Sequence, residues 1–159
     1  MDRPSKFFLP LALSKKFQQF KEQGQKIVFT NGCFDLLHVG HVRILNQAKR
    51  LGDVLVVALN TDSSVRKLKG KKRPLVSLKE RMEILSSLEA VDYVTSFSDE
   101  TPQRIIQILN PDILVKGGDY KMDQVVGARY VKDQGGKVVI LPFIKGRSSS
   151  DLLRKMKAL

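Results

Sequence analysis

Two histidines, His38 and His41, are the only ones in this chain, and they lie three positions apart with Gly40 between them. They follow an apolar run at 26–29 and a turn of small residues at 31–33, and a helical pattern begins after them. A helix N-terminus attracts anions because its free N–H groups and its dipole point the same way. Imidazoles add directional donors near pH 7. This spacing predicts a site for a polyphosphate.

A metal site is the alternative use of two histidines at this spacing. Cys33, the single cysteine, is close by, but no carboxylate-rich set completes a structural zinc site around them. Their position directly after a strand and a glycine turn favours phosphate. We predict no residues whose main role is metal ligation.

A second phosphate-binding pattern lies near the C-terminus. Gly146 and Arg147 precede the hydroxyl triplet Ser148, Ser149 and Ser150, and a closing helix is expected over 151–157. Hydroxyls at a helix N-cap together with free N–H groups suit an anion. On its own this pattern would indicate only an ordinary helix cap. The prediction that it binds phosphate therefore depends on the presence of the two histidines.

Six of the eight residues in 66–73 are basic, and Gly70 allows the chain to bend there. Such a run is most often a solvated loop. Because it follows the carboxyl end of the expected strand 53–59, it is also a candidate mobile lid over phosphates.

Arg81 lies in the first turn of a helix that a capping box of Ser77 and Glu80 opens. A cation at a helix start opposes the dipole, which suggests that Arg81 turns toward bound phosphate. The alternative is a surface arginine paired with Glu80 or Asp92.

Alternating segments position these residues. Apolar runs at 26–29, 53–59, 91–94, 113–115 and 137–141 predict strands, and helical patterns lie between them. This order predicts an α/β fold, a Rossmann-like three-layer sandwich with a five-stranded, mainly parallel sheet. We expect a single domain over 1–159, with an N-terminal extension over 1–25 containing a helix from Ser14, and a core over 26–159. Glycines at 117 and 118 let a ligand approach the fourth strand closely.

Composition limits the partners. The chain has 159 residues, 28 Lys and Arg against 16 Asp and Glu, a net charge of +12, and no Trp. Few aromatics interleave with the basic residues, so we expect small anionic substrates and a Lys-rich surface rather than nucleic acid. One cysteine fits a reducing cytosol, hence a cytoplasmic protein. We expect no membrane partner, because no stretch approaches ~20 apolar residues, and no signal peptide.

The motif Asn31-Gly32-Cys33-Phe34-Asp35 with His38-Val39-Gly40-His41, together with the serine triplet, resembles the cytidylyltransferase-like nucleotidyltransferases. Segments 68–70, 99–104 and 114–120 further resemble the adenylyltransferase half of the bacterial bifunctional heptose kinase/adenylyltransferases, here without the kinase half. Glu89 stands where glycerol-3-phosphate cytidylyltransferases carry an arginine.

The resemblance implies transfer of AMP from ATP to D-glycero-D-manno-heptose 1-phosphate, with Mg²⁺ held mainly by substrate phosphates. Cytidylyl transfer to glycerol 3-phosphate, an FAD-synthetase-like reaction and, more distantly, a non-catalytic nucleic-acid-binding domain stay open. So do a homodimer and a separate heptose kinase acting upstream.

The implied roles fall into three groups. The catalytic group is His38, His41 and Lys69. The nucleotide-binding group is Asn31, Gly32, Cys33, Phe34, His38, Gly40, His41, Arg81, Lys116, Gly117, Asp119, Gly146, Arg147, Ser148, Ser149 and Ser150. The substrate-binding group is Asp35, Lys69, Lys71 and Arg73.

Overall fold

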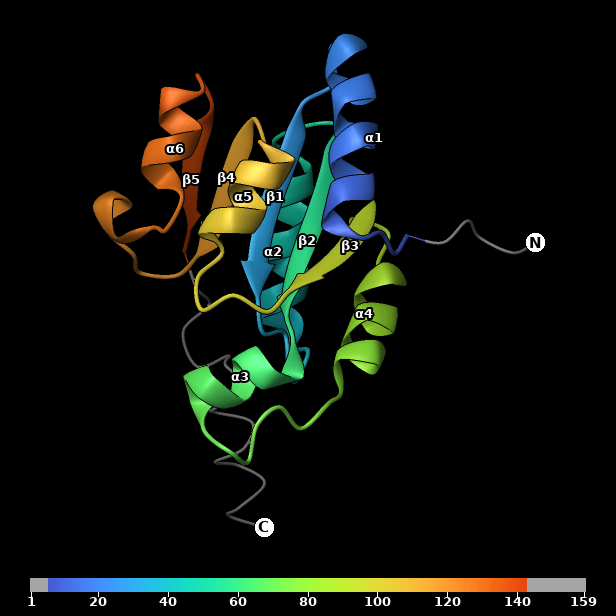
Figure 1. Cartoon of the computed structure of the whole chain (residues 1–159), viewed down its shortest axis with the longest axis vertical. Coiled ribbons are helices and arrows are strands. Elements are labelled where there is room, and N and C mark those ends of the chain that lie inside the picture. Colours follow the sequence, from blue (N-terminus) through green and yellow to red (C-terminus); the bar gives the residue numbers. More distant parts are fainter. Residues whose placement is uncertain (1–5, 143–159) are drawn as a thin grey trace, which may run out of the picture.

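A single parallel sheet organises the computed structural model, which describes residues 6–142 (Figure 1). Its strands are β1 (Ile27–Gly32), β2 (Val54–Asn60), β3 (Tyr93–Phe97), β4 (Ile113–Gly117) and β5 (Lys137–Leu141). They lie in the order β3-β2-β1-β4-β5, and every pairing is parallel. The predicted α/β fold with a five-stranded sheet is confirmed, and the described sheet is parallel throughout.

The two central strands are apolar on both sides, as a sheet covered on both faces requires. All seven residues of β2 are buried, and β1 pairs with it in the register Ile27↔Val54 to Gly32↔Leu59. On its other side β1 pairs with β4. The strand order therefore reverses between β1 and β4, and in such sheets ligands bind at the carboxyl ends beside this point.

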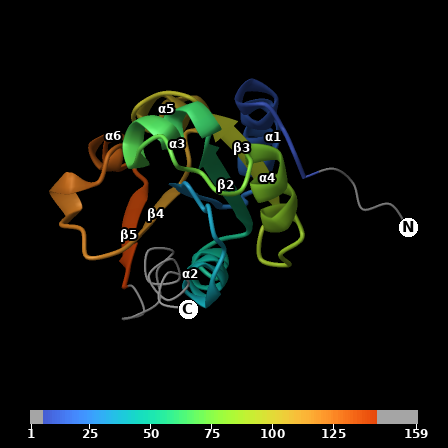
Figure 2. The same cartoon turned by 90° about the horizontal axis from the view of Figure 1, so that it is seen from below.

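Helices cover both faces of the sheet, which gives the expected three layers (Figures 1 and 2). One face carries α1 (Pro10–Glu22), α5 (Gln103–Leu109) and α6 (Ala128–Asp133), whose apolar residues share a core with Phe29 and Val56. The other face carries α2 (Val39–Lys49) and α4 (Leu78–Ser86), which pack on Val28 and Val57. Since alternate residues of a strand point to opposite faces, each strand contributes to both cores.

The first helix begins earlier than the expected start at Ser14. Pro10 occupies its first turn, where the fixed φ of proline suits a helix and no N–H is needed. Leu13 and Phe17 are fully buried in the core, so the helix packs on the sheet. Ahead of it, Phe7 forms a parallel bridge with Val94 and extends the edge of the sheet at β3.

Two further segments differ from expectation. The basic run is half helical, because α3 (Asp62–Lys69) continues into it from a cap in which Thr61 Oγ1 accepts the Ser64 N–H. The helical segment expected between 113–115 and 137–141 is divided, because α6 begins only at Ala128, after the 3₁₀ turn η1 (Met122–Gln124). Gly127, with φ of +86°, separates the two, and a helix cannot pass through that conformation. Within residues 6–142, no helix is long and apolar enough to cross a membrane.

Candidate functional site

The two histidines form the N-terminal cap of α2. His38 is the N-cap residue with an extended backbone, and its Nδ1 accepts the N–H of Gly40 at 3.1 Å. Nδ1 of His41 accepts the N–H of His38 at 3.4 Å, which reciprocates the cap. The rings stack with centroids 3.8 Å apart. Side chains thus satisfy helix-end donors that would otherwise lack a partner.

This geometry fixes where each neutral ring carries its proton. A ring nitrogen that accepts a hydrogen bond has no hydrogen, so the proton of both imidazoles lies on Nε2. Burial, with a smaller contribution from the nearby His38 and Lys69, lowers the pKa of His41 from 6.5 to about 4. At neutral pH His41 is therefore an uncharged Nε2–H donor.

His41 faces a cleft of about 400 Å³ at the carboxyl edge of the sheet. The cleft brings together nine of the predicted site residues: Asn31, Gly32, Cys33, Phe34, Asp35, His41, Lys69, Lys116 and Gly117. It also has lining residues that are absent from the predicted groups: Thr30, Ile44, Asn60, Leu68, Glu100, Pro102 and Tyr120. Asn60 directly ends β2, and Glu100, Pro102 and Tyr120 lie in the segments 99–104 and 114–120. Their positions at or after the carboxyl ends of strands could have indicated from the sequence that these four residues line the cleft.

Phe34 shapes the floor of the cleft. Its φ of +45° lies in the left-handed region, which non-glycine residues rarely adopt. The ring lies 5.0 Å from the ring of His41. A Cβ at Gly32 would come within 3.0 Å of the Phe34 ring, so the glycine makes room for it. Phe34 contributes packing against the histidine as well as backbone.

Lys116 supplies a cation from β4, on the other side of the switch point. Burial lowers its pKa from the ordinary value. Its Nζ lies 3.5 Å from Asn31 Oδ1 and 5.7 Å from the centroid of the Tyr120 ring. A half-buried ammonium with few partners among residues 6–142 favours an anionic ligand.

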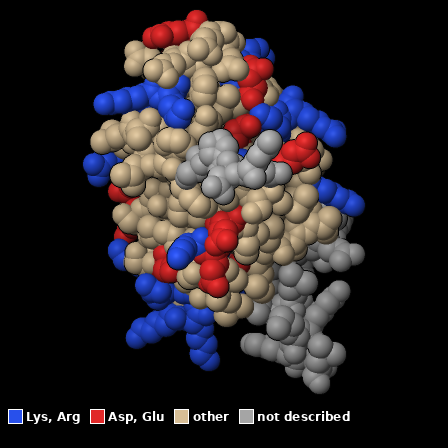
Figure 3. Space-filling view, turned by 90° about the vertical axis from the view of Figure 1, so that its right-hand side faces the viewer, with Lys and Arg blue, Asp and Glu red and all other residues tan. Residues whose placement is uncertain are grey.

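Lys69 approaches from α3, as the last residue of that helix. Gly70 follows with φ of +95° and turns the chain away. Figure 3 shows Lys and Arg side chains gathered at the lower end of the molecule, the end where α3 lies in Figure 1. Lys71 is exposed and is not among the residues that line the cleft.

Two residues predicted to bind substrate bind each other. The Asp35 carboxylate is buried and forms an ion pair with Nε of Arg73. Nη2 of Arg73 is also buried and has no acceptor among the described residues. Both oxygens of Asp35 accept protein donors, so a contact of Asp35 with substrate stays a prediction.

The expectation that Arg81 faces phosphate is wrong, and so is the alternative pairing with Glu80 or Asp92. Its side chain is 0 % exposed and pairs with Asp62 at 2.6 Å. Nη1 donates to the carbonyls of Cys33 and Asn60, and Nε donates to that of Val76. Arg81 therefore ties the ends of β1 and β2 together beneath the cleft.

The other predicted residues lie outside the cleft or outside the described chain. Gly40 is buried in the first turn of α2, and its N–H is taken by His38. Asp119 is exposed and is not among the lining residues. Residues 146–150 fall outside the described residues.

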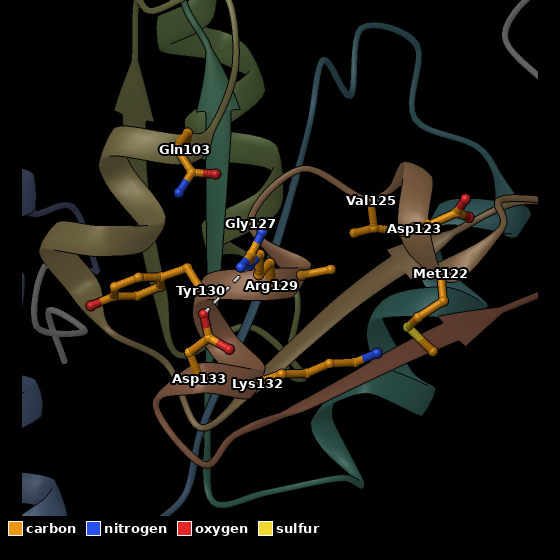
Figure 4. Close-up of a pocket in the computed structure, with 10 residues that line it drawn as sticks. Gln103, Met122, Asp123, Val125, Gly127, Arg129, Tyr130, Lys132 and Asp133 are labelled. Carbon is orange, nitrogen blue, oxygen red and sulfur yellow. Dashed lines mark ion pairs between the residues drawn. The ribbon is translucent and has the colours of Figure 1, made fainter.

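A larger groove of about 760 Å³ lies along α6 (Figure 4). Two of its four charged residues, Arg129 and Asp133, pair with each other at 3.9 Å and are largely exposed. None of His38, His41 and Lys69 lines this groove. The chemistry-bearing groups therefore favour the smaller cleft as the site.

Within residues 6–142, no group of three or more His, Cys, Asp and Glu side chains is placed so that it could hold a metal ion. Of the two carboxylates that line the cleft, Asp35 is engaged and Glu100 is exposed. A divalent ion in this cleft would therefore depend mainly on oxygens of a bound phosphate.

Comparisons with known proteins give a consistent picture. The bifunctional protein HldE of Citrifermentans bemidjiense is 56% identical over 84% of this chain, and that of Hydrogenovibrio crunogenus is 56% identical over 86%. The chain spans only 28% of the length of each of these relatives.

Two solved structures are similar as well. The lipopolysaccharide core biosynthesis protein of Thermoplasma volcanium is 32% identical, with a TM-score of 0.64 over 77% of this chain and 98% of that one. The pantoate-β-alanine ligase of Francisella tularensis, 20% identical with a TM-score of 0.56 over 91% of this chain and 75% of that one, shares the fold alone. The family model described as cytidylyltransferase-like matches residues 29–153, and this chain belongs to that family.

Proposed function

We propose that this protein transfers AMP from ATP to D-glycero-D-manno-heptose 1-phosphate and releases pyrophosphate, forming ADP-heptose. The observation that carries the proposal is the capping pair of histidines at the N-terminus of α2, of which His41 lines the cleft together with Lys69 and Lys116. Similarity to the HldE proteins over most of the chain supports the heptose substrate.

The proposed reaction is a direct displacement. A phosphate oxygen of the acceptor forms a bond to the α-phosphorus of ATP, and the bond from that phosphorus to the bridging oxygen breaks. Pyrophosphate leaves with the electron pair. Since the attacking oxygen is already anionic, no general base is required, and catalysis consists of positioning and charge stabilisation.

Each described group has a part in this proposal. His41 donates from Nε2–H to a phosphoryl oxygen without bringing a charge of its own, and His38 acts beside it. Lys69 follows the negative charge that builds on the α-phosphoryl group. Lys116 and the backbone of residues 31–34 hold the remainder of the nucleotide. Mg²⁺, bound through phosphate oxygens, would neutralise charge on the triphosphate.

The setting of the reaction is part of the proposal. The relatives are named bifunctional and are more than three times as long as the match. We propose that a separate heptose kinase supplies the phosphorylated sugar, that the protein acts in the cytoplasm, and that a homodimer is compatible with the site.

The test is pyrophosphate release with ATP, CTP, GTP and UTP against heptose 1-phosphate, other sugar 1-phosphates and glycerol 3-phosphate. The proposal expects turnover with ATP and the heptose 1-phosphate in the presence of Mg²⁺. Turnover with CTP and glycerol 3-phosphate alone would replace the substrate assignment and leave the family unchanged.

A further inference from the structure

Asp35 is 3 % exposed, and its carboxylate is fully engaged by another segment. Oδ1 accepts the N–H of Leu75 at 2.7 Å and that of Val76 at 2.9 Å, and Oδ2 accepts Nε of Arg73 at 2.5 Å. All three donors lie within four consecutive residues. A buried carboxylate is costly unless hydrogen-bonded, so this set binds the segment to the turn that follows β1.

The bound segment is the far end of the loop that begins at Lys69. Gly70 follows Lys69, and its carbonyl accepts the N–H of Arg73 at 3.0 Å, which closes a tight turn. On the other side of Lys69, α3 is held by the Thr61 cap and by the ion pair of Asp62 with the buried Arg81. Lys69 therefore lies between two anchors, and Asp35 provides one of them.

Asp35 also restrains the histidine side of the cleft. Its chain neighbour Phe34 holds a left-handed backbone and packs its ring against His41. Such a conformation is strained for a residue other than glycine and persists only where the surroundings enforce it. The three hydrogen bonds of Asp35, one residue further on, provide that enforcement.

We infer that Asp35 is a positioning residue, which holds His41 and Lys69 in register across the cleft without contacting substrate. The inference rests on the proposed function, because it assigns both groups to the reacting phosphates. A misplacement of about 1 Å in such a register can lower turnover on the order of 10²-fold.

The first test is a double-mutant cycle of Asp35→Asn and Lys69→Ala. Asp35→Asn keeps the size of the side chain but removes the ion pair with Arg73. We expect it to lower kcat at least 30-fold in the wild-type background and by a smaller factor, about tenfold or less, in the Lys69→Ala background, where only the loss through His41 remains. The KM for ATP should change less than threefold.

The matched control is Asp92→Asn. Asp92 likewise accepts a backbone N–H, that of Leu55 at 2.7 Å, and pairs with Lys49 at 2.6 Å. It directly precedes β3, so it lies at the amino ends of the strands, whereas the cleft lies at their carboxyl ends. Its replacement should leave kcat within twofold of wild type. Multiplicative effects of Asp35→Asn and Lys69→Ala, or a raised KM for the heptose 1-phosphate at unchanged kcat, would overturn the positioning role.

The second test does not require activity. The loop offers trypsin Lys71 and Lys72, and cleavage there can be followed by mass spectrometry under native conditions. Asp35→Asn should raise this cleavage rate at least tenfold, while Asp92→Asn should not. If Asp35→Asn fails to fold, Arg73→Gln, which leaves the two backbone bonds, should raise it by a smaller factor.

These readouts separate the two claims. A wild-type protein that releases no pyrophosphate with any nucleotide and acceptor would end the proposed function, and the cleavage rates would still decide the anchor. Equal cleavage in wild type and variant would refute the anchor whatever the kinetics show.

Discussion

Replacement of His41 by Gln, Asn and Ala tests the assignment of its proton to Nε2. The amide nitrogen of Gln reaches the position of Nε2, whereas that of Asn reaches only the position of Nδ1, which in the structure accepts the N–H of His38. Removing one transition-state donor costs about 2.7–4 kcal/mol, or about 10²–10³ in kcat. We expect His41→Ala and His41→Asn to lose that full factor and His41→Gln to retain at least tenfold more activity.

The dependence on pH gives a second magnitude from the same geometry. With a pKa of about 4, about 3% of His41 is protonated at pH 5.5, whereas an ordinary histidine with a pKa near 6.5 would be about 90% protonated. Because Gln does not titrate, the ratio of wild-type to His41→Gln kcat cancels the titration of the substrates. We expect this ratio to stay constant within twofold between pH 5.5 and 8.

The assay is steady-state pyrophosphate release at saturating ATP and heptose 1-phosphate, with folding checked by circular dichroism. Equal activity of the Gln and Asn variants would contradict the tautomer. A tenfold change of the ratio across pH 6.5 would contradict the lowered pKa, and a fully active His41→Ala would remove His41 from the reaction.

Lys69→Ala should lower kcat at least tenfold, which corresponds to about 1.4 kcal/mol of activation free energy, whereas replacement of the exposed Lys67 by Ala should leave kcat near wild type. Equal, salt-sensitive losses of kcat in both variants would mean that the basic run only steers anions. Arg81→Met should lower the free energy of unfolding by about 3 kcal/mol or more, because it leaves Asp62 and buried carbonyls without their donor. Urea denaturation measures this loss, and a loss below 1 kcal/mol would refute the prediction. The lowered pKa of His41 means that the unfolded chain takes up a proton before the folded one does, so stability should fall as pH falls from about 6.5 through about 4. In urea titrations, His41→Gln should lose less stability over that range than wild type, and identical losses would contradict the assignment.

The sheet was predictable from sequence because its strands are short, apolar and bounded by turn residues. The capping box of Ser77 and Glu80 was predictable for the same local reason, and the structure confirms it. The extent of α1 was missed because only Ser14 was interpreted as a helix start, whereas Pro10 lies in the first turn. The helical half of the basic run was missed because charge dominated that stretch, although Thr61 caps it.

The site was predictable where it depends on local spacing. His38 and His41 meet because one turn of helix brings them together, and Asn31 to Phe34 line the cleft because they lie at the carboxyl end of β1. Partners distant in sequence were not predictable in this way. Asp35 and Arg73, or Arg81 and Asp62, find each other only through the packing of separate elements, so their charges read as ligand contacts until the fold is known.

The central claim is that the α-phosphoryl group of ATP moves to the acceptor phosphate. The most direct measurement incubates the protein with heptose 1-phosphate, Mg²⁺ and ATP labelled with ³²P at either the α or the γ position. The account predicts that the α label appears in the sugar nucleotide and the γ label in pyrophosphate. A γ label transferred to the sugar, or an α label that stays with free AMP, would contradict it.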